Sequence, residues 1–191
     1  MWETHLPMLR RIQDSLDEEI FISTPRTIDE SGMTDEELLK LLESCDAAII
    51  YRQNGGFSER LRSLLYPIKD RFRIINFAND PSLWDLTSVD HAVATKTYEY
   101  MLKGGDENLR RMIDYVAKTL CGKEGEPLPP MDFPWQAVVS IEDDALYEDV
   151  DEYMRHVEDP SLPFVGVLGS RPALLMDGLS VEKELCRHIS M

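Results

Sequence analysis

Hydrophobic residues recur every three or four positions in several stretches of the chain, the spacing that aligns side chains on one face of a helix. This pattern predicts an opening helix over residues 6–16, where the repeated residues are leucine and isoleucine. It predicts further helices over residues 34–45, 61–68, 88–102, 106–120, 142–159 and 180–189. The helix over 34–45 also begins with a capping box, because Thr34 is followed three positions later by Glu37.

Short apolar runs alternate with these helices and predict strands. The runs cover residues 19–23, 46–51, 72–77 and 164–168. The run at 46–51 is almost wholly apolar, as expected for a strand that is covered on both faces. Strands that alternate with helices indicate a parallel sheet between two helical layers. We therefore expect an α/β fold of the flavodoxin or Rossmann type, with an open, mostly parallel sheet of three to four strands flanked by helices.

Proline divides the chain into two regions. Residues 122–134 contain four prolines and predict an extended tether. The expected organisation is an α/β N-terminal domain over residues 1–121, a proline-rich linker over 122–134, and the beginning of a second α/β unit over 135–191. A single strand and helix cannot bury both of their faces. The second unit must therefore dock on the first, pair with another chain, or belong to a longer protein.

The charge of the chain narrows the classes of partner. The 191 residues include 20 Lys and Arg against 36 Asp and Glu, for a formal net charge of −16. An acidic surface repels phosphate backbones and anionic lipid, so we expect neither nucleic-acid binding nor polybasic membrane docking. No apolar run approaches the roughly 20 residues of a membrane span, and no signal peptide is recognisable. The widely spaced Cys45, Cys121 and Cys186 favour a reducing compartment. We expect a cytoplasmic protein.

Candidate binding residues follow the predicted strands. In open parallel sheets, ligands gather beyond the carboxyl ends of the strands. One such end carries Arg52, Asn54, Gly55 and Gly56, and the loop after the last predicted strand carries Ser170 and Arg171. Arginine and asparagine suit carboxylate or amide groups, and glycine permits a close backbone approach. The alternative is that Gly55 and Gly56 only form a tight turn. No nucleophile–base pair or metal-ligand spacing is evident, so we expect no catalytic residue and no metal site.

Four motifs together resemble the N-terminal part of the cobaltochelatase large subunit and of the related magnesium chelatase H subunit. The first is Ile-Ile-Tyr-Arg leading to Gly-Gly at residues 49–56, and the second is Tyr-x-Tyr-x-x-x-Gly-Gly-x-x-Asn-Leu at 98–109. The third is Pro-Trp-Gln-Ala at 134–137, and the fourth is Phe-Val-Gly-Val-Leu-Gly-Ser-Arg at 164–171. The resemblance spans residues 20 to 191. Where the family has a histidine after its Pro-Trp element, this chain has Ser140 and Ile141.

The resemblance implies a part of a very large protein that binds a corrin-type or porphyrin-type ring and inserts a divalent metal. The expected partners are the rest of the large subunit, separate ATPase subunits and a tetrapyrrole. The complex is expected to use ATP with Mg²⁺ and to insert cobalt or magnesium as its substrate metal, with no cofactor bound by this chain. Because most of the family's length lies beyond residue 191, the isolated chain is not expected to be catalytic.

Two other hypotheses compete with this one. The first is a stand-alone acidic α/β module that binds small molecules or proteins without catalysis. The second is a complete small enzyme, which the missing nucleophile–base pair disfavours. A response-regulator receiver is also disfavoured. Its phosphoacceptor would be an aspartate at the end of a central strand, whereas the predicted strands of the N-terminal domain end in Ser23, Arg52 and Phe77-Ala78.

Overall fold

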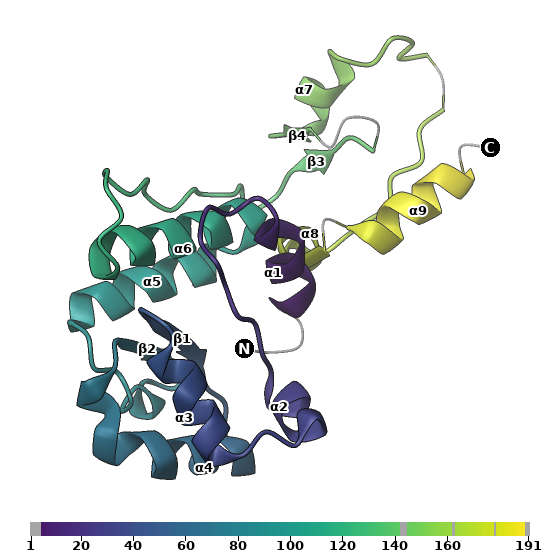
Figure 1. Cartoon of the computed structure of the whole chain (residues 1–191). Helices are drawn as coiled ribbons and strands as arrows, with labels where there is room; N and C mark the ends of the chain where they lie inside the picture. The colour runs from purple at the N-terminus through teal and green to yellow at the C-terminus, as the bar shows by residue number, and fades with distance from the viewer. Residues whose placement is uncertain (1–4, 142–144, 162, 178, 190–191) are drawn as a thin grey trace. The chain divides into compact units, whose positions relative to one another are not determined.

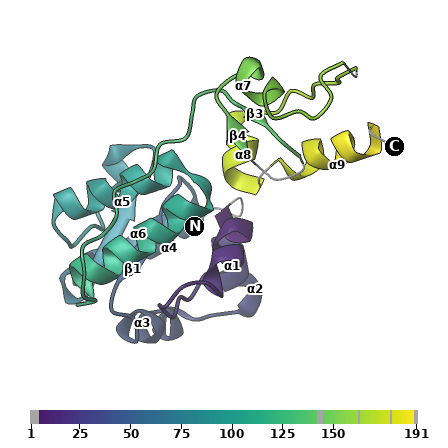
Figure 2. The same cartoon turned by 90° about the horizontal axis from the view of Figure 1, so that it is seen from above.

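The computed structural model describes residues 5–141, 145–161, 163–177 and 179–189. The chain divides into two compact units, with the boundary between Met131 and Asp132 (Figures 1 and 2). The first unit combines a small parallel sheet with helices, and this confirms the α/β class. The second unit consists of short helices and a two-residue hairpin ladder.

The sheet of the first unit consists of β1 (Ala48–Tyr51) and β2 (Ile74–Phe77). The two strands are parallel, with Ala48 opposite Ile74 and Tyr51 opposite Phe77. Both strands arise from the continuous apolar runs that predicted them, and every residue of β2 is buried. Because the strands are parallel and in register, their carboxyl ends meet at one edge of the sheet.

The sheet in the described residues has two strands, so the expected three or four strands are not found. On the outer side of β2, Ser88 and Thr87 take the place of a further strand. The Ser88 amide donates to the Ile74 carbonyl at 3.0 Å, and the Asn76 amide donates to Thr87 Oγ1 at 3.2 Å. This loop satisfies the backbone groups that a neighbouring strand would otherwise bond.

The predicted strands at 19–23 and 164–168 are wrong, because neither segment forms a ladder. Phe21 is 59% exposed, and the first segment ends where Thr24 caps an unpredicted helix, α2 (Pro25–Ser31). In the second segment, Leu168 is fully exposed. An apolar run becomes a strand only when another strand lies beside it to take its hydrogen bonds.

The helices of the first unit follow the predicted periodicity, although the helix expected over 61–68 begins at Gly56 and ends at Leu65. Their bounds are α1 (Leu6–Gln13), α3 (Asp35–Glu43), α4 (Gly56–Leu65), α5 (His91–Lys103) and α6 (Gly105–Leu120), with the 3-10 turns η2 (Tyr66–Arg71) and η3 (Pro81–Leu83). The capping box of α3 is present, because Thr34 Oγ1 accepts from the Glu37 amide and the Glu37 carboxylate accepts from the Thr34 amide. Asp90 caps α5, whereas Ser88 bonds to β2.

Helices cover both faces of the sheet. Figure 1 shows α5 and α6 side by side over one face, with α3 and α4 on the other. The layer between the sheet and α3 and α4 is built on Leu65, Ile74 and Leu86, which are completely buried. On the other side, the inward face of α6 is buried as its spacing predicted, including Leu109 and Met112.

The proline-rich segment is fastened to the first unit as far as Met131. Asn108 is fully buried on α6 and bonds this segment at both ends of its amide. Its Nδ2 donates to the Met131 carbonyl at 2.9 Å, and its Oδ1 accepts from the Met131 amide at 2.7 Å. The Tyr100 hydroxyl donates to the Leu128 carbonyl and adds a second attachment. The Tyr and Asn residues of the 98–109 motif therefore hold the following segment in place.

The second unit contains few buried residues. Its elements are β3 (Val138–Val139), β4 (Leu146–Tyr147), α7 (Val150–Met154), α8 (Arg171–Asp177) and α9 (Ser180–Ile189). The strands β3 and β4 pair antiparallel, and α9 confirms the predicted last helix. The predicted helix over 142–159 is confirmed only in α7, and residues 142–144 lie outside the described ranges. Among its described residues, only Ser140, Leu175 and Leu179 are buried.

Candidate functional site

A small crevice lies at the edge where both parallel strands end. Its volume is about 150 Å³. It is lined by three residues that follow β1 (Arg52, Gln53 and Asn54), three that follow β2 (Ala78, Asn79 and Asp80), and Leu83 of η3. The parallel register of β1 and β2 places these two loops side by side. The crevice therefore lies where open parallel sheets usually bind ligands.

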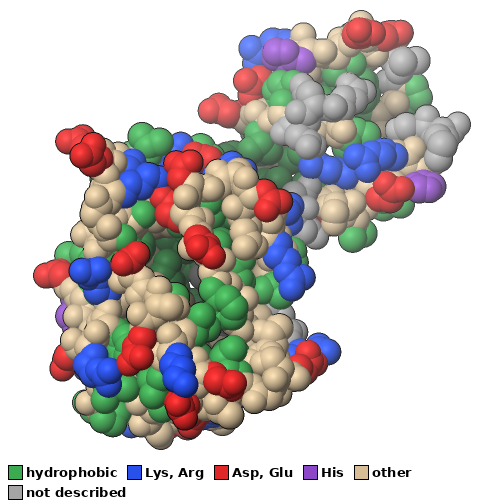
Figure 3. All heavy atoms as spheres, in the orientation of Figure 1, with side chains coloured by type: hydrophobic (Ala, Val, Ile, Leu, Met, Phe, Trp, Pro, Cys, Tyr) green, Lys and Arg blue, Asp and Glu red, His purple; other side chains and the backbone are tan. Residues whose placement is uncertain are grey.

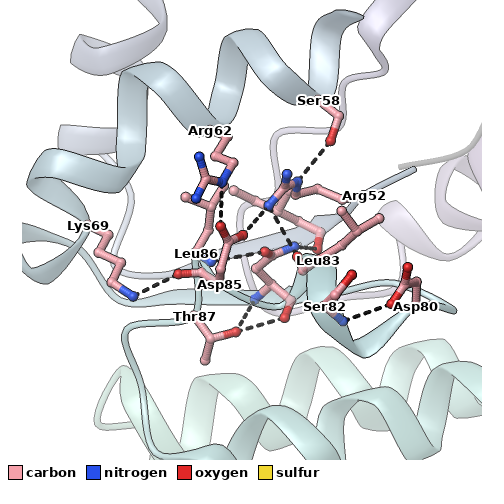
Figure 4. A network of polar contacts seen from close by, with 12 residues as sticks. Arg52, Ser58, Arg62, Lys69, Asp80, Ser82, Leu83, Asp85, Leu86 and Thr87 are labelled. Carbon is pink, nitrogen blue, oxygen red and sulfur yellow. Dashed lines mark hydrogen bonds and ion pairs between the residues drawn. The ribbon is translucent and has the colours of Figure 1, made fainter. Parts of the chain in front are cut away.

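Arg52 is the most deeply placed polar residue of the crevice, with only 3% of its surface exposed. Figure 4 shows its guanidinium between α4 and the loop that follows η3. Its Nε donates to Ser58 Oγ at 2.9 Å, and its Nη1 donates to the Leu83 carbonyl at 3.2 Å and to the Asp85 carboxylate. Its Nη2 is buried and has no hydrogen-bond partner in the described structure.

Asp85 is held in position by the loop that covers the outer side of β2. The buried Asn76 accepts from the Leu86 amide through Oδ1 at 3.3 Å, and its Nδ2 donates to the Ile50 carbonyl at 3.2 Å. Lys69 Nζ donates to the Asp85 carbonyl at 2.7 Å. These bonds fix the backbone on both sides of Asp85, so its carboxylate is presented to Arg52 and to Arg62 of α4.

The electrostatics of this region differ from the acidic average of the chain. Burial acts to raise the pKa of Asp85, but the hydrogen bonds from Arg62 and Arg52 outweigh it and hold this pKa below its ordinary value. Bonds from Ser82, whose amide lies 2.9 Å from the carboxylate, lower the pKa of Asp80. The region therefore contains three cations, which are Arg52, Arg62 and Lys69. It contains two carboxylates, which are Asp80 and Asp85. On the face shown in Figure 3, cationic and acidic side chains of the first unit are otherwise interspersed.

The loop between β1 and α4 forms the outer rim of the crevice. Gln53, Asn54, Gly55 and Gly56 are exposed, as expected for the edge of a binding site. Gly55 is the N-cap of α4, has a φ of 144°, and offers no side chain to the first turn. This backbone conformation requires glycine. The amide N–H groups at the start of α4 therefore have no side-chain cap, in contrast to those of α2, α3 and α5.

A cluster of aromatic rings holds the strand-end residues Ala78 and Asn79 in place. Tyr51 and Tyr98 both donate from their hydroxyls to Asn79 Oδ1, at 2.8 and 3.2 Å. Phe77 lies against both tyrosines, with ring centroids 5.5 and 5.2 Å away. The Trp84 ring packs edge-on against Tyr98, and its Nε1 donates to the Ala78 carbonyl at 2.9 Å. The aromatic cluster thus supports Ala78 and Asn79 from behind, and the lining of the crevice itself is mostly polar.

The two other predicted site residues belong to the second unit. Ser170 lies just before α8, where its Oγ accepts from the Ala173 amide at 3.2 Å. Arg171 donates from Nε to the Pro134 carbonyl at 3.3 Å, and its guanidinium lies 5.6 Å from the Trp135 ring centre. These contacts give both residues local structural roles. The structure brings Arg52, Asn54, Gly55 and Gly56 together in the first unit, whereas Ser170 and Arg171 belong to the second unit.

Sequence reasoning missed Asn79 and Asp85. Asn79 directly follows β2, so the rule for strand ends that selected Arg52 would also have selected it. Asp85 carries no such signal, because it reaches Arg52 through the loop that Asn76 holds. In the described ranges no three His, Cys, Asp or Glu side chains converge as a metal site requires. None of the described helices combines the length and apolar character needed to cross a bilayer.

Comparison with known proteins agrees with the motifs. Residues 98–191 match the family described as CobN/Magnesium Chelatase. An uncharacterized protein of Methanocaldococcus jannaschii, MJ1441, is 25% identical over 190 residues, covering 99% of this chain and 14% of that protein. The catalytic subunit of cobaltochelatase from Mycobacterium tuberculosis has a similar fold, with a TM-score of 0.54 and 19% identity.

The solved structure shares its fold with 73% of this chain, which corresponds to 11% of the chain of that subunit. This chain therefore spans a small part of the length of both relatives. The family match includes the Gly-Gly-x-x-Asn-Leu stretch at residues 104–109, whose Asn108 anchors Met131, and the segment 164–171. Residues 98–191 therefore resemble the CobN/magnesium chelatase family, as the motifs of the sequence indicated.

Proposed function

We propose that this chain is a piece of a cobaltochelatase-like large subunit that helps to hold a tetrapyrrole during ATP-dependent metal insertion in the biosynthesis of cobalamin or a related cofactor. The crevice at the ends of β1 and β2 is the observation that carries this proposal. It combines an arginine with amide groups, which suit the carboxylates or amides at the edge of a tetrapyrrole ring. Its proposed place of action is the cytoplasm.

The surface of the second unit supports the proposal that the chain works within a larger protein. Phe164, Val165 and Leu168 are exposed, although they form a continuous apolar segment. On α9, Val181 and Leu185 are exposed on one face of the helix. We propose that residues 164–168, which form no strand in the described chain, pair with a strand from the rest of the large subunit.

Catalysis belongs to other parts of the proposed complex. The crevice contains no nucleophile–base pair, and its one exposed carboxylate, Asp80, is held by Ser82. The chain would therefore bind and orient the ring, while separate ATPase subunits supply conformational work and other parts of the large subunit receive the pyrrole protons. Cobalt or magnesium would be the substrate metal. We expect the purified chain to insert neither metal unaided.

A ligand titration tests this proposal. The chain is titrated with cobyrinic acid, which carries carboxylates, with cobinamide, which carries amides in their place, and with uroporphyrin. Tryptophan fluorescence reports binding, because Trp84 bonds to the wall of the crevice. We expect saturable quenching by at least one carboxylate-bearing ring. Absence of saturable binding for all three rings favours the stand-alone interaction module instead.

Variants locate the binding. Arg52→Ala is expected to weaken ring binding by about tenfold, because it removes a charge-assisted hydrogen bond. Asn54→Asp serves as a second test, since Asn54 is exposed and its replacement leaves the buried network intact. Arg110→Ala on α6 is the matched control for loss of one arginine. Unchanged affinity in both crevice variants would remove the crevice from the proposed ring site.

A further inference from the structure

The buried Arg52 guanidinium has one N–H group that the fold leaves without a partner. Its Nε and Nη1 are both used, but Nη2 is buried and has no hydrogen-bond partner in the part of the chain that the structure describes. Leaving a buried charged donor unsatisfied is destabilising, because the group has lost its hydration and gains no hydrogen bond in return. Such a group in a native structure calls for an acceptor that the chain itself does not supply.

The direction of Nη2 follows from the planarity of the guanidinium. Nε–H and one N–H of Nη2 lie side by side on the same edge of the group. Because Nε donates to Ser58 in the first turn of α4, Nη2 faces the start of the same helix. The loop that leads into this helix carries Gln53 and Asn54, which line the crevice. The open edge of the fork matches the spacing of two carboxylate oxygens.

Asn79 presents a second unused donor to the same crevice. Its Oδ1 accepts from the hydroxyls of both Tyr51 and Tyr98, which fixes the orientation of the amide. Its Nδ2 is therefore turned away from the two phenols, and within the described ranges it donates to no other residue. Arg52 and Asn79, which follow adjacent strands, thus both line one crevice, and each carries one N–H donor that is not used within the described ranges.

We propose that this crevice binds a carboxylate arm of a larger ligand, with Arg52 Nη2 and Asn79 Nδ2 as its donors and Gln53 and Asn54 as its rim. A volume of about 150 Å³ is small beside the roughly 300–1,000 Å³ of sites that enclose whole ligands, so only a side arm enters. The carboxylate of Asp80 on the crevice wall disfavours a second negative charge on the ligand. Because this carboxylate can accept a hydrogen bond, it favours a ligand arm with an amide or another donor nearby.

Entry of the arm requires the rim to shift, because Nη2 is covered in the structure described here. Gly55 supplies this freedom, since its φ of 144° lies in a region open to glycine. The uncapped amides at the start of α4 lie next to the rim and favour negative charge there. The inference deepens the proposed function: that the larger ligand is a tetrapyrrole rests on that proposal, whereas the carboxylate site rests on the geometry of Arg52 and Asn79.

The test uses probes without a ring. The ¹⁵N-labelled chain is titrated with sodium propionate at constant ionic strength, and with propionamide as the uncharged probe of the same shape. We expect saturable shifts of the amide signals of residues 53–56 and of the Asn79 side-chain NH₂ with propionate only. Inorganic phosphate is a third arm. Saturation by phosphate at lower concentration than propionate would overturn the assignment to a carboxylate.

Matched variants decide whether the named donors carry the binding. Asn79→Asp keeps an oxygen for both tyrosines but removes the NH₂ donor and adds a negative charge, so propionate affinity should fall at least about tenfold. Gln53→Glu places a charge on the rim and should have the same effect. Gln13→Glu on α1 makes the identical change at an exposed position and should leave affinity within about twofold.

The outcomes separate this inference from the proposed function. Propionate affinity that stays unchanged in both Asn79→Asp and Gln53→Glu would overturn the carboxylate site, even if corrins still bind. If Asn79→Asp disturbs the fold, which amide signals remote from the crevice would show, Gln53→Glu alone decides. Saturable propionate binding with no binding of any tetrapyrrole would leave the site in place and contradict the proposed function.

Discussion

At the scale of single residues, the pair of Arg52 and Asp85 connects the fold to the crevice. Arg52 is almost fully buried, and the Asp85 side chain is only 24% exposed. The Asp85 carboxylate also accepts from Arg62, so it links β1, α4 and the loop beyond η3. Breaking a buried pair by removing one partner is strongly destabilising, because it leaves an uncompensated charge inside the protein.

We expect Asp85→Asn to lower the free energy of unfolding by about 3 kcal/mol at pH 7. The pKa of Asp85 is lowered in the folded state, so its stabilising contribution is complete above the ordinary value of about 3.9. This contribution is lost as the pH falls through the lower folded pKa. Urea unfolding from pH 6 down to pH 2 should therefore show a shallower acid-dependent loss of stability in the variant.

Asp70→Asn is the control for this prediction, because Asp70 is exposed on η2. It should change the unfolding free energy by less than about 0.5 kcal/mol. If both variants lose the same stability and retain the same dependence on pH, Asp85 does not perform the role assigned to it.

At the scale of elements, helices could be predicted better than strands. The capping box at Thr34 and Glu37 and the inward face of α6 are local features, and both are present in the structure. The runs at 46–51 and 19–23 both looked like strands. Only the first contributes to the sheet, because the second has no neighbouring strand for its hydrogen bonds. Strand pairing depends on residues far away in the sequence, and a single sequence does not record it.

The same distinction applies to the candidate site. Arg52 could be found because it directly follows a predicted strand. Asp85 could not, because its position depends on the bond from the Leu86 amide to the buried side chain of Asn76. The unused Nη2 of Arg52 also depends on which neighbours take its other N–H groups, and this requires coordinates.

The turn from β1 into α4 gives a prediction for two adjacent glycines. Gly55→Ala should destabilise the chain by about 1–3 kcal/mol, because a φ of 144° and a ψ of 168° are accessible essentially only to glycine. Gly56→Ala should be neutral or stabilise by about 0.4–1 kcal/mol, because Gly56 begins the helix and nothing lies near its added Cβ. Urea denaturation of both variants measures the difference. Equal effects at the two positions would show that the turn does not need the conformation described.

At the scale of the whole molecule, the two units differ in how well each buries its own apolar residues. In the first unit, Ile12, Leu65, Ile74 and Leu109 are completely buried, and the described segment up to Met131 is fastened to α6 by Asn108. In the second unit, Leu175 and Leu179 are the buried apolar residues of the described part, whereas Trp135 is 85% exposed. A chain segment with so small a core gains little stability from burial.

A chain that ends at Met131 should therefore fold by itself, with a single cooperative thermal transition and with the near-ultraviolet signal of its aromatic cluster around Phe77. Residues 132–191 alone should show no cooperative transition, because their apolar segments at 164–168 and on α9 are exposed. Circular dichroism and calorimetry on the two segments measure this. Cooperative unfolding of residues 132–191 alone would mean that this unit needs no cover from a larger subunit, and the proposal that residues 164–168 join a sheet of that subunit would lose its physical basis.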